Sequence, residues 1–234
     1  MSAVAPPEIA AGAGPETVLR WAYATFPRVV IVASFQAESS VLIDMASQIR
    51  GDVSVLTLDT GRLPQATYDM IDRVRDRYGI DVQVVSPDPT DLQEMVGHHG
   101  VNLFHKSPDL RRLCCEIRKS RPLARALAGY DAWITGVRRQ QATTRAATAV
   151  VAADAEHEGL TKIAPLATWT KDQVWAYIRE RSLPYHTLYE RGYTSIGCEP
   201  CTRATSAGED ERAGRWWWEQ GENKECGLHS SETG

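Results

Sequence analysis

Short apolar runs alternate with segments whose apolar residues recur at helical spacing along much of the chain. Four runs rich in β-branched residues predict strands, at residues 29–33, 53–58, 81–85 and 131–135. Between the first two, segment 41–49 places its apolar residues on one helical face. Alternation of strands and helices predicts a doubly wound, mainly parallel α/β sheet, in which ligands bind at the carboxyl ends of the strands.

Local signals predict where several helices begin and end. Gly79 is expected to end the helix after the second strand, because glycine readily takes the left-handed conformation at a helix C-terminus. The helix that carries Cys114 is expected to be halted around Pro122. Thr170 and Gln173 stand at capping-box spacing, which predicts a helix start. From residue 137 to about residue 158 no period is sustained, so a long loop is expected.

Polar residues follow three of the predicted strands. The loop 34–40 joins the first strand to a helix, Asp59 follows the second strand and Arg138 follows the fourth. A strand that ends in a polar loop and opens a helix offers backbone N–H groups and the positive end of a helix dipole. This loop therefore predicts an anion site. The alternative is that Ser39 does no more than cap the helix.

Four of the five cysteines form two close pairs, Cys114–Cys115 and Cys198–Cys201, while Cys226 stands alone. Thiols that a reducing cytosol keeps unbridged can converge as ligands of one metal centre. Zinc sites usually use C-x(2–4)-C spacings, whereas a cubane offers four iron corners that adjacent cysteines can reach separately. The spacing favours an iron–sulfur cluster over zinc, with buried structural cysteines as the remaining alternative.

Composition limits the partners. The chain has 234 residues and a net charge of -4, which argues against general nucleic-acid binding but leaves room for a local cluster of cations around a small anion. The first fourteen residues carry no basic run, and no apolar stretch reaches the length of a membrane span. We therefore expect a cytoplasmic protein that binds neither nucleic acid nor membrane. A homo-oligomer is left open.

Six motifs occur in order from the first strand to the last residues. They are Ser34-Phe-x-x-Glu38-Ser39, Leu58-Asp59-Thr60-Gly61-Arg62-Leu63, Cys114-Cys115-x-x-Arg118-Lys119-x-x-Pro122-Leu123, Gly136-x-Arg138-Arg139, Gly192-Tyr-Thr-Ser-Ile-Gly-Cys198-x-Pro-Cys201-Thr and Glu225-Cys226-Gly-Leu-His229. Together they resemble the assimilatory adenylylsulfate (APS) reductases over nearly the whole chain after residue 28. The loop after the first strand departs from the family pattern, with Gln36 and Ser40 in place of a small and an acidic residue.

The resemblance implies an adenine-nucleotide alpha-hydrolase-like (PP-loop) fold and one 4Fe-4S cluster per chain, held by Cys114, Cys115, Cys198 and Cys201. It also implies reduction of APS to sulfite and AMP in sulfate assimilation, with thioredoxin or a glutaredoxin-like reductant as partner. On this basis residues 1–27 are an N-terminal extension with a first helix. Residues 28–207 are the nucleotide-binding domain with the cluster, and residues 208–234 are a mobile tail that carries the catalytic cysteine.

Thiol chemistry makes Cys226 the expected nucleophile, because cysteine has enough thiolate near neutral pH to attack an activated sulfur. Its S-sulfonate product needs an external dithiol, since the chain has no resolving cysteine beside it. The resemblance adds Lys119 and His229 to the catalytic group. The expected substrate-binding residues are Ser34, Glu38, Ser39, Asp59, Thr60, Gly61, Arg62, Gly136, Arg138, Arg139, Arg212 and Arg215.

Three other functions compete with this one. Reductases of 3'-phosphoadenylylsulfate (PAPS) share the Glu-Cys-Gly-Leu-His ending but generally lack the cluster cysteines, and the loop 34–40 here offers Glu38 and no cation for a second phosphate. PP-loop ATP pyrophosphatases and tRNA thiolation enzymes would use an S-G-G-x-D-S type loop, which this loop is not. A cluster-bearing redox sensor or electron carrier would have no need of Cys226.

Overall fold

The computed structural model describes Ile9, residues 13–157 and 159–219, and Glu225. Within these residues a six-stranded sheet has the order β3-β2-β1-β4-β6-β5. Neighbouring strands are parallel except for the last pair, in which β5 runs antiparallel to β6. The strands are β1 Val29–Val32, β2 Val55–Leu58, β3 Val82–Val85, β4 Ala132–Ile134, β5 Val151–Ala153 and β6 Thr161–Ile163. The predicted doubly wound, mainly parallel sheet is confirmed.

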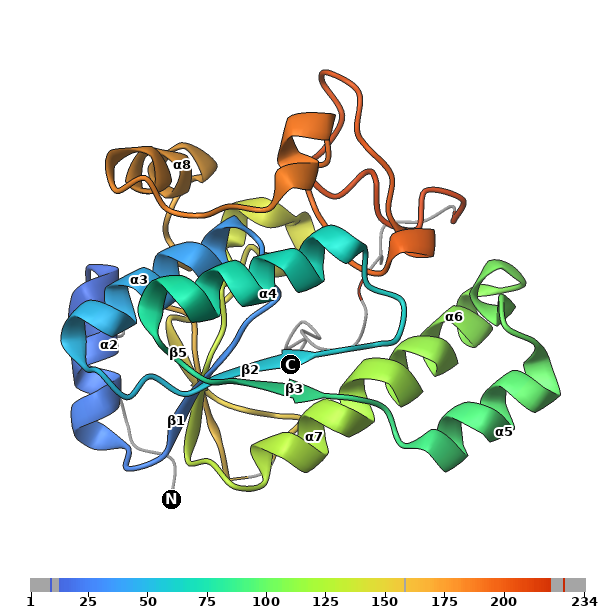
Figure 1. The fold of residues 1–234 in the computed structure, drawn as a ribbon, viewed down its shortest axis with the longest axis horizontal. Helices are drawn as coiled ribbons and strands as arrows, with labels where there is room; N and C mark the ends of the chain where they lie inside the picture. Colours follow the sequence, from blue (N-terminus) through green and yellow to red (C-terminus); the bar gives the residue numbers. More distant parts are fainter. Residues whose placement is uncertain (1–8, 10–12, 158, 220–224, 226–234) are drawn as a thin grey trace.

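Helices cover both faces of this sheet (Figure 1). The described α-helices are α2 Pro15–Thr25, α3 Ala37–Ile49, α4 Gln65–Tyr78, α5 Pro89–His99, α6 Pro108–Cys115, α7 Arg121–Leu127 and α8 Lys171–Glu180. Successive strand residues point to opposite faces. Ile31 accordingly belongs to the core shared with α2, α3, α4 and α8, whereas Val30 packs with Leu123 and Leu127 of α7. A strand buried on both faces has to be apolar throughout, as β1 is.

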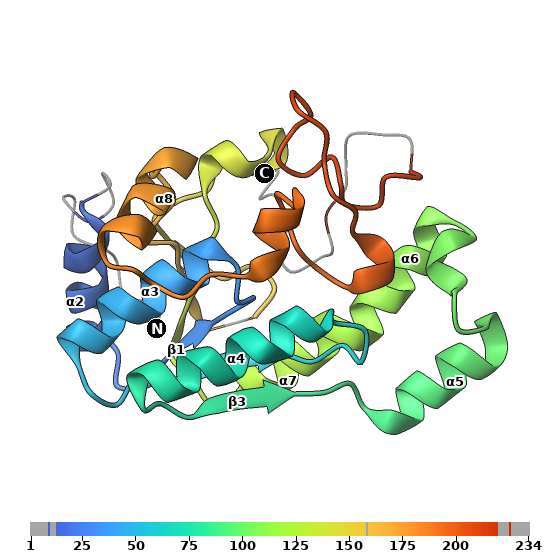
Figure 2. The same ribbon diagram turned by 45° about the horizontal axis from the view of Figure 1, so that its top comes forward.

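The strand order changes direction at β1. From β1 the chain passes through α3 to β2 and then to β3, while β4 lies on the other side of β1. In such sheets the loops leaving the carboxyl ends of the strands diverge at the reversal, and the crevice between them receives the ligand. The segment after α8, orange to red, returns to lie beside α6 in both views (Figures 1 and 2).

The local helix signals were mostly correct. Gly79 caps α4 with a left-handed φ of 61°, and Thr170 and Gln173 form the capping box of α8. The halt at Pro122 is wrong: a π-helical turn, Glu116–Ser120, follows α6, and Pro122 lies in the first turn of α7. Proline is tolerated there because the first-turn N–H groups have no intrahelical partner.

The long loop predicted after β4 is also wrong in part, because it contains β5 and two short 3-10 turns. Strand β6, which pairs with β4, was missed as well. Both strands are only three residues long, too short for an alternating pattern to show.

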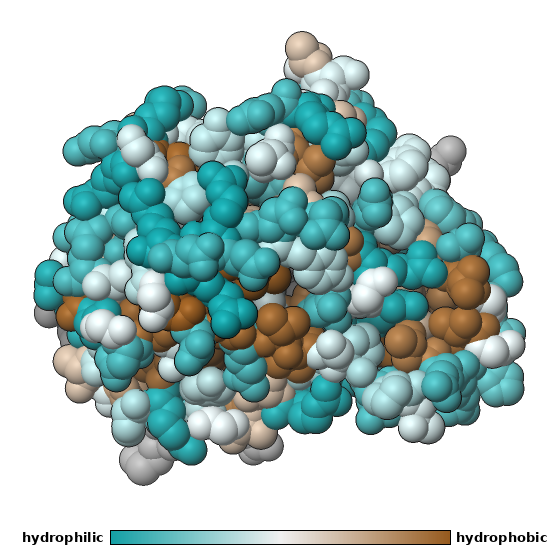
Figure 3. Space-filling view, in the orientation of Figure 1, coloured by the Kyte–Doolittle hydropathy of each residue, from teal (hydrophilic) through white to brown (hydrophobic). Residues whose placement is uncertain are grey.

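The face shown in Figure 3 is largely hydrophilic, with apolar side chains gathered in smaller areas. No helix in the described part of the chain is long and apolar enough to cross a membrane.

Candidate active site

A pocket opens where the loops leaving β1, β2 and β4 meet. Ser34, Glu38 and Ser39 line it after β1, Thr60 lines it after β2, and Gly136 lines it after β4. The side chains of Lys119, Arg145, Arg212 and Arg215 bring positive charge to the same pocket. The anion site predicted from the loop 34–40 therefore coincides with a cavity at the sheet reversal.

The loop between β1 and α3 is held by its own side chains. The Ser34 backbone N–H donates to Ser39 Oγ at 3.1 Å, and Gln36 Nε2 donates to Ser34 Oγ at 3.1 Å. Gln36 rather than Ser39 is the N-cap of α3, and no side chain there bonds the first helical turn. Phe35 adopts a left-handed φ of 55°, a conformation that costs free energy for a bulky residue and that the buried ring maintains.

Gly136 allows the end of β4 to approach α3 closely. A Cβ atom at Gly136 would lie 2.8 Å from Glu38 Cβ, which is closer than two such atoms can pack. Glycine is therefore needed at this position so that Glu38 can reach the pocket wall.

Arg138 organises the wall from behind. Its side chain is 1% exposed, and its Nε donates to Glu38 Oε1 at 2.7 Å while Nη2 donates to Glu211 Oε1 at 2.9 Å. Gln141 Nε2 also donates to Glu38 Oε1, at 3.1 Å. Arg138 is not among the residues that line the pocket; it contacts the lining through Glu38 and through its backbone N–H, which donates to Gln141 Oε1 at 3.1 Å.

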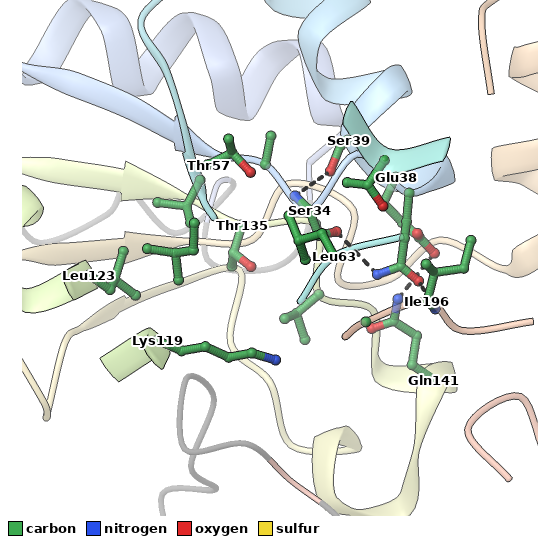
Figure 4. Close-up of a pocket in the computed structure, with 18 of the residues that line it drawn as sticks. Ser34, Glu38, Ser39, Thr57, Leu63, Lys119, Leu123, Thr135, Gln141 and Ile196 are labelled. Carbon is green, nitrogen blue, oxygen red and sulfur yellow. Dashed lines mark hydrogen bonds between the residues drawn. The ribbon is translucent and has the colours of Figure 1, made fainter. Parts of the chain in front are cut away.

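Lys119 lies between the pocket and a second, adjacent cavity. It belongs to the π-helical turn after Cys115, is 9% exposed and lines both cavities. Figure 4 shows its side chain extending into the space beneath Ser34. The wider π turn is a local distortion of the kind that is frequent at functional sites. Lys119 therefore lies beside the cysteines, while its catalytic role stays a prediction.

The second cavity is bordered by all four paired cysteines. Cys114 and Cys115 end α6, and Cys198 and Cys201 bracket a short 3-10 turn; all four side chains are buried and none is part of a disulfide. The other lining residues are Arg62, Phe104, Arg111, Arg118, Lys119 and Trp216. The two sequence-distant pairs therefore converge on one chamber that has aromatic and cationic walls and, among the described residues, no acidic side chain in its lining.

Burial sets the chemistry of these thiols. It raises the pKa of Cys114 despite the nearby Arg118, and it raises the pKa of Cys201 to about 12. Such thiols stay protonated at neutral pH unless a metal ion binds the sulfur and displaces the proton. Arg118 is itself held by a hydrogen bond, because its Nη1 donates to the Thr60 carbonyl at 2.6 Å. Its buried Nε has no hydrogen-bond partner among the residues that the structure describes.

Arg215 is positioned by a glycine. A Cβ at Gly197 would lie 2.3 Å from Arg215 Nη2, so only glycine lets this guanidinium lie against the loop that leads to Cys198. The Arg215 guanidinium also stacks 4.7 Å from the centre of the Trp216 ring. Arg215 and Trp216 are both buried, so this part of the segment after residue 208 is packed against the domain.

Other expected substrate residues stabilise loops instead of lining the pocket. Asp59 accepts from the Gly61 N–H at 2.8 Å and from the Tyr68 hydroxyl at 2.7 Å. Arg62 lines the cysteine chamber, and Arg139 donates to the Thr148 carbonyl at 2.8 Å. Cys226 and His229 lie outside the described residues, so their predicted roles are not addressed by these contacts.

Sequence reasoning missed Arg145, Gln141 and Thr57 as pocket residues. Arg145 lies in the segment taken for a loop without structure, and its main partner, Glu225, is eighty positions away. No local pattern could have shown that contact. Gln36 was noticed only as a departure from a motif, yet its side chain accepts from the Ile196 N–H at 2.7 Å and joins two walls of the pocket.

Comparisons with known proteins agree with this geometry. The protein-family model described as the phosphoadenosine phosphosulfate reductase domain matches residues 28–204. The adenosine 5'-phosphosulfate reductase of Allochromatium vinosum is 47% identical over 204 residues, which cover 87% of this chain and 79% of that protein.

Solved structures extend the comparison to the fold. The phosphoadenylyl-sulfate reductase of Candida auris, solved as a phosphate complex, has a TM-score of 0.72 at 30% identity and covers 86% of this chain and 99% of its own. Yeast FAD synthetase, at 12% identity and a TM-score of 0.58 over 87% of this chain and 70% of its own, shares the fold alone. The expected PP-loop type of sheet is thereby confirmed. By sequence match, coverage and architecture, the chain belongs to the phosphoadenosine phosphosulfate reductase family.

Proposed function

We propose that this chain reduces adenosine 5'-phosphosulfate to sulfite and AMP in sulfate assimilation, in the cytoplasm. The observation that carries the proposal is Lys119, which lines both the pocket at the sheet reversal and the four-cysteine chamber. The Allochromatium vinosum relative bears the name of this activity. A pocket with Lys119, Arg212 and Arg215 in its walls suits a phosphosulfate anion, and Leu58, Leu123 and Val137 add apolar surface for a base.

The reaction needs one nucleophile and one external dithiol. The Cys226 thiolate attacks the sulfur of the phosphosulfate, an S–S bond forms, the S–O bond breaks, and AMP leaves with the electron pair. Thioredoxin or a glutaredoxin-like dithiol then attacks the Cys226 sulfur, and sulfite leaves with the second pair. The donor's other thiol closes its disulfide and frees Cys226. His229 belongs to this catalytic group on the resemblance.

Cationic side chains supply the electrostatic part. Negative charge grows on the leaving phosphate as the S–O bond breaks, and fixed cations stabilise that charge best where water is excluded. Arg215 is buried and stacked on Trp216, in space that Gly197 leaves open, so little reorganisation is needed when the charge appears. Lys119 reaches the same pocket from the π-helical turn after Cys115.

The donor set of the second cavity fits a 4Fe-4S cluster. Four buried thiols border one chamber, and Arg62, Arg111, Arg118 and Lys119 can balance the negative charge of four thiolates on iron. The preference for a cluster over one zinc rests on the cysteine spacing, because adjacent cysteines can reach separate irons of a cubane more readily than they can converge on one tetrahedral ion. When bound, the cluster would supply charge beside Lys119 rather than electrons, since the thiols already provide both.

Preference for APS over PAPS is part of the same proposal. The loop 34–40 carries no Lys or Arg, and its one charged residue, Glu38, is held by Arg138. A 3'-phosphate placed near this loop would meet a carboxylate and would have to be desolvated without a partner. Comparing kcat/KM for the two nucleotides with the same reductant tests this, and equal values would contradict it.

Purified protein provides the test of the function. We expect a brown protein that makes sulfite from APS and a dithiol protein and releases no pyrophosphate from ATP. Pyrophosphate release without sulfite would favour the PP-loop ATP pyrophosphatases. A reversibly reduced cluster without sulfite formation would favour an electron carrier.

A further inference from the structure

The carboxylate of Glu225 is bound by several side chains at once. Arg145 donates two hydrogen bonds to this carboxylate, from Nε to Oε1 at 2.9 Å and from Nη2 to Oε2 at 2.8 Å. Thr144 Oγ1 donates to Oε1 at 3.0 Å and Arg212 Nη2 donates to Oε2 at 3.1 Å. The backbone carbonyl of Glu225 accepts from Arg111 Nη1 at 2.5 Å. Both the side chain and the main chain of this residue are therefore fixed.

The groups that receive Glu225 are themselves held in place. Arg111 is 1% exposed, forms a bidentate pair with Glu219 and stacks 4.6 Å from the centre of the Trp216 ring. The side chain of Arg145 is 9% exposed, and its Nη1 donates to Gln141 Oε1 at 2.7 Å. A site whose donors are already ordered binds a carboxylate with little loss of side-chain entropy.

The receptor for Glu225 is part of the pocket wall, because Arg145 and Arg212 line the pocket. Cys226 follows Glu225 by one peptide bond, so the two Cα atoms are about 3.8 Å apart. We propose that Glu225 is a positioning residue that anchors the chain at the pocket and so brings the Cys226 thiol to the substrate. This inference rests on the proposed function of Cys226.

A different role would be competition, with the carboxylate occupying the place of the substrate anion. The contacts favour the anchor. The three guanidinium nitrogens of Arg145 are all engaged by protein groups, since Glu225 takes Nε and Nη2 and Gln141 takes Nη1. Gln141 is held in turn by Glu38. Arg145 is thus held in place to bind the carboxylate, and Arg215, stacked on Trp216, is a further cation of the pocket.

The experiment compares Glu225→Gln with Glu209→Gln, a control that removes a carboxylate from an exposed pair with Arg203 outside the pocket. Cys226 S-sulfonation is followed in a single turnover with saturating APS and no reductant. We expect Glu225→Gln to slow it roughly 10- to 100-fold, the range for losing hydrogen bonds to a charged group, with AMP affinity unchanged. Glu225→Asp, which keeps the charge, should recover part of the rate.

A second readout works without substrate. The rate at which iodoacetamide alkylates Cys226, measured on its peptide, should rise in Glu225→Gln and stay at the wild-type value in Glu209→Gln. Equal alkylation and sulfonation rates in wild type and Glu225→Gln would overturn the anchor, as would tighter APS binding at unchanged kcat. If wild-type protein formed no S-sulfonate, the proposed function would fail, and alkylation would still decide whether Glu225 anchors the chain.

Discussion

Thr60 Oγ1 lies 3.2 Å from Cys198 Sγ, so the loop after β2 touches the second cysteine pair directly. The same loop receives Arg118 through the Thr60 carbonyl and bonds the Glu199 N–H through the Arg62 carbonyl at 2.8 Å. The pocket at the sheet reversal and the cysteine chamber thus share a wall. A substitution in the lining of one cavity should therefore alter the geometry of the other.

Iron content tests the cysteine chamber. Anaerobically purified protein should contain about four irons and an equal amount of labile sulfide per chain, as four thiolates on a cubane require. Cys198→Ser should lose iron and brown colour, whereas Cys226→Ser should keep both. Stoichiometric zinc without sulfide would contradict the cluster.

Lys119 should matter for turnover but not for loading the cluster. Lys119→Gln removes a cation next to the growing charge, and losing one such preorganised donor typically costs about 100- to 1,000-fold in kcat. Iron content and the visible spectrum should remain those of the wild type, because Lys119 is not a thiol ligand. Lys119→Arg should retain part of the rate. Loss of iron in Lys119→Gln would instead mean that this residue holds the chamber together.

Gly136→Ala tests the close contact between β4 and α3. The added methyl group would meet Glu38 Cβ at 2.8 Å, so we expect the free energy of unfolding to fall by about 1–3 kcal/mol. Gly97→Ala is the matched control, since Gly97 lies in α5 with nothing within 4 Å of the new Cβ. Alanine there should be neutral or stabilising by up to about 1 kcal/mol. Denaturant titration of both variants measures the difference.

His186 should make stability depend on pH. It is fully buried, accepts from the Leu188 N–H at Nδ1 and therefore presents Nε2–H to Thr67, 2.9 Å away. Burial lowers the pKa of His186 from 6.5 to about 4. Between pH 6.5 and pH 4 the histidine is protonated in the unfolded chain but neutral in the folded chain. The contribution of His186 to the free energy of unfolding is therefore fully present above about pH 6.5. It falls toward pH 4 by at most about 1.4 kcal/mol per pH unit.

The His186→Asn variant isolates that effect. Its side-chain oxygen can still accept from Leu188, but it cannot titrate. The wild type should be the more stable form at pH 7, and the gap in Tm should narrow as the pH falls to 5. A gap that stays constant over this range would show that His186 is not responsible.

The parts of the fold that sequence could predict depend on short-range physics. Apolar runs such as 29–33, the glycine cap at Gly79 and the capping box at Thr170 are each decided by residues within one or two turns. The predicted halt at Pro122 was wrong because proline can end one helix and is also favoured in the first turn of the next. The π turn after Cys115 shows that Pro122 lies at the start of a helix here.

The site was predicted where residue chemistry is distinctive and missed where it depends on packing. The two cysteine pairs were expected to converge because thiol spacing limits what they can bind, and Lys119 was expected beside them because it lies one helical turn beyond Cys115. Arg138 was expected in the pocket but lies behind Glu38, and Arg145 was missed, because both positions are set by carboxylates roughly 80 to 100 residues away. The sequence around an arginine does not show which distant carboxylate its guanidinium will bind.

In the proposed reaction a cysteine of this chain attacks the sulfur of adenylylsulfate. This step is tested most directly by incubating wild-type protein with APS in the absence of reductant and measuring modified peptides by mass spectrometry. One sulfonate group should appear on the peptide that contains Cys226, with one AMP released per chain, and thioredoxin should then discharge it as sulfite. A sulfonate on Cys114 or Cys201, or AMP release without any modified cysteine, would contradict the account.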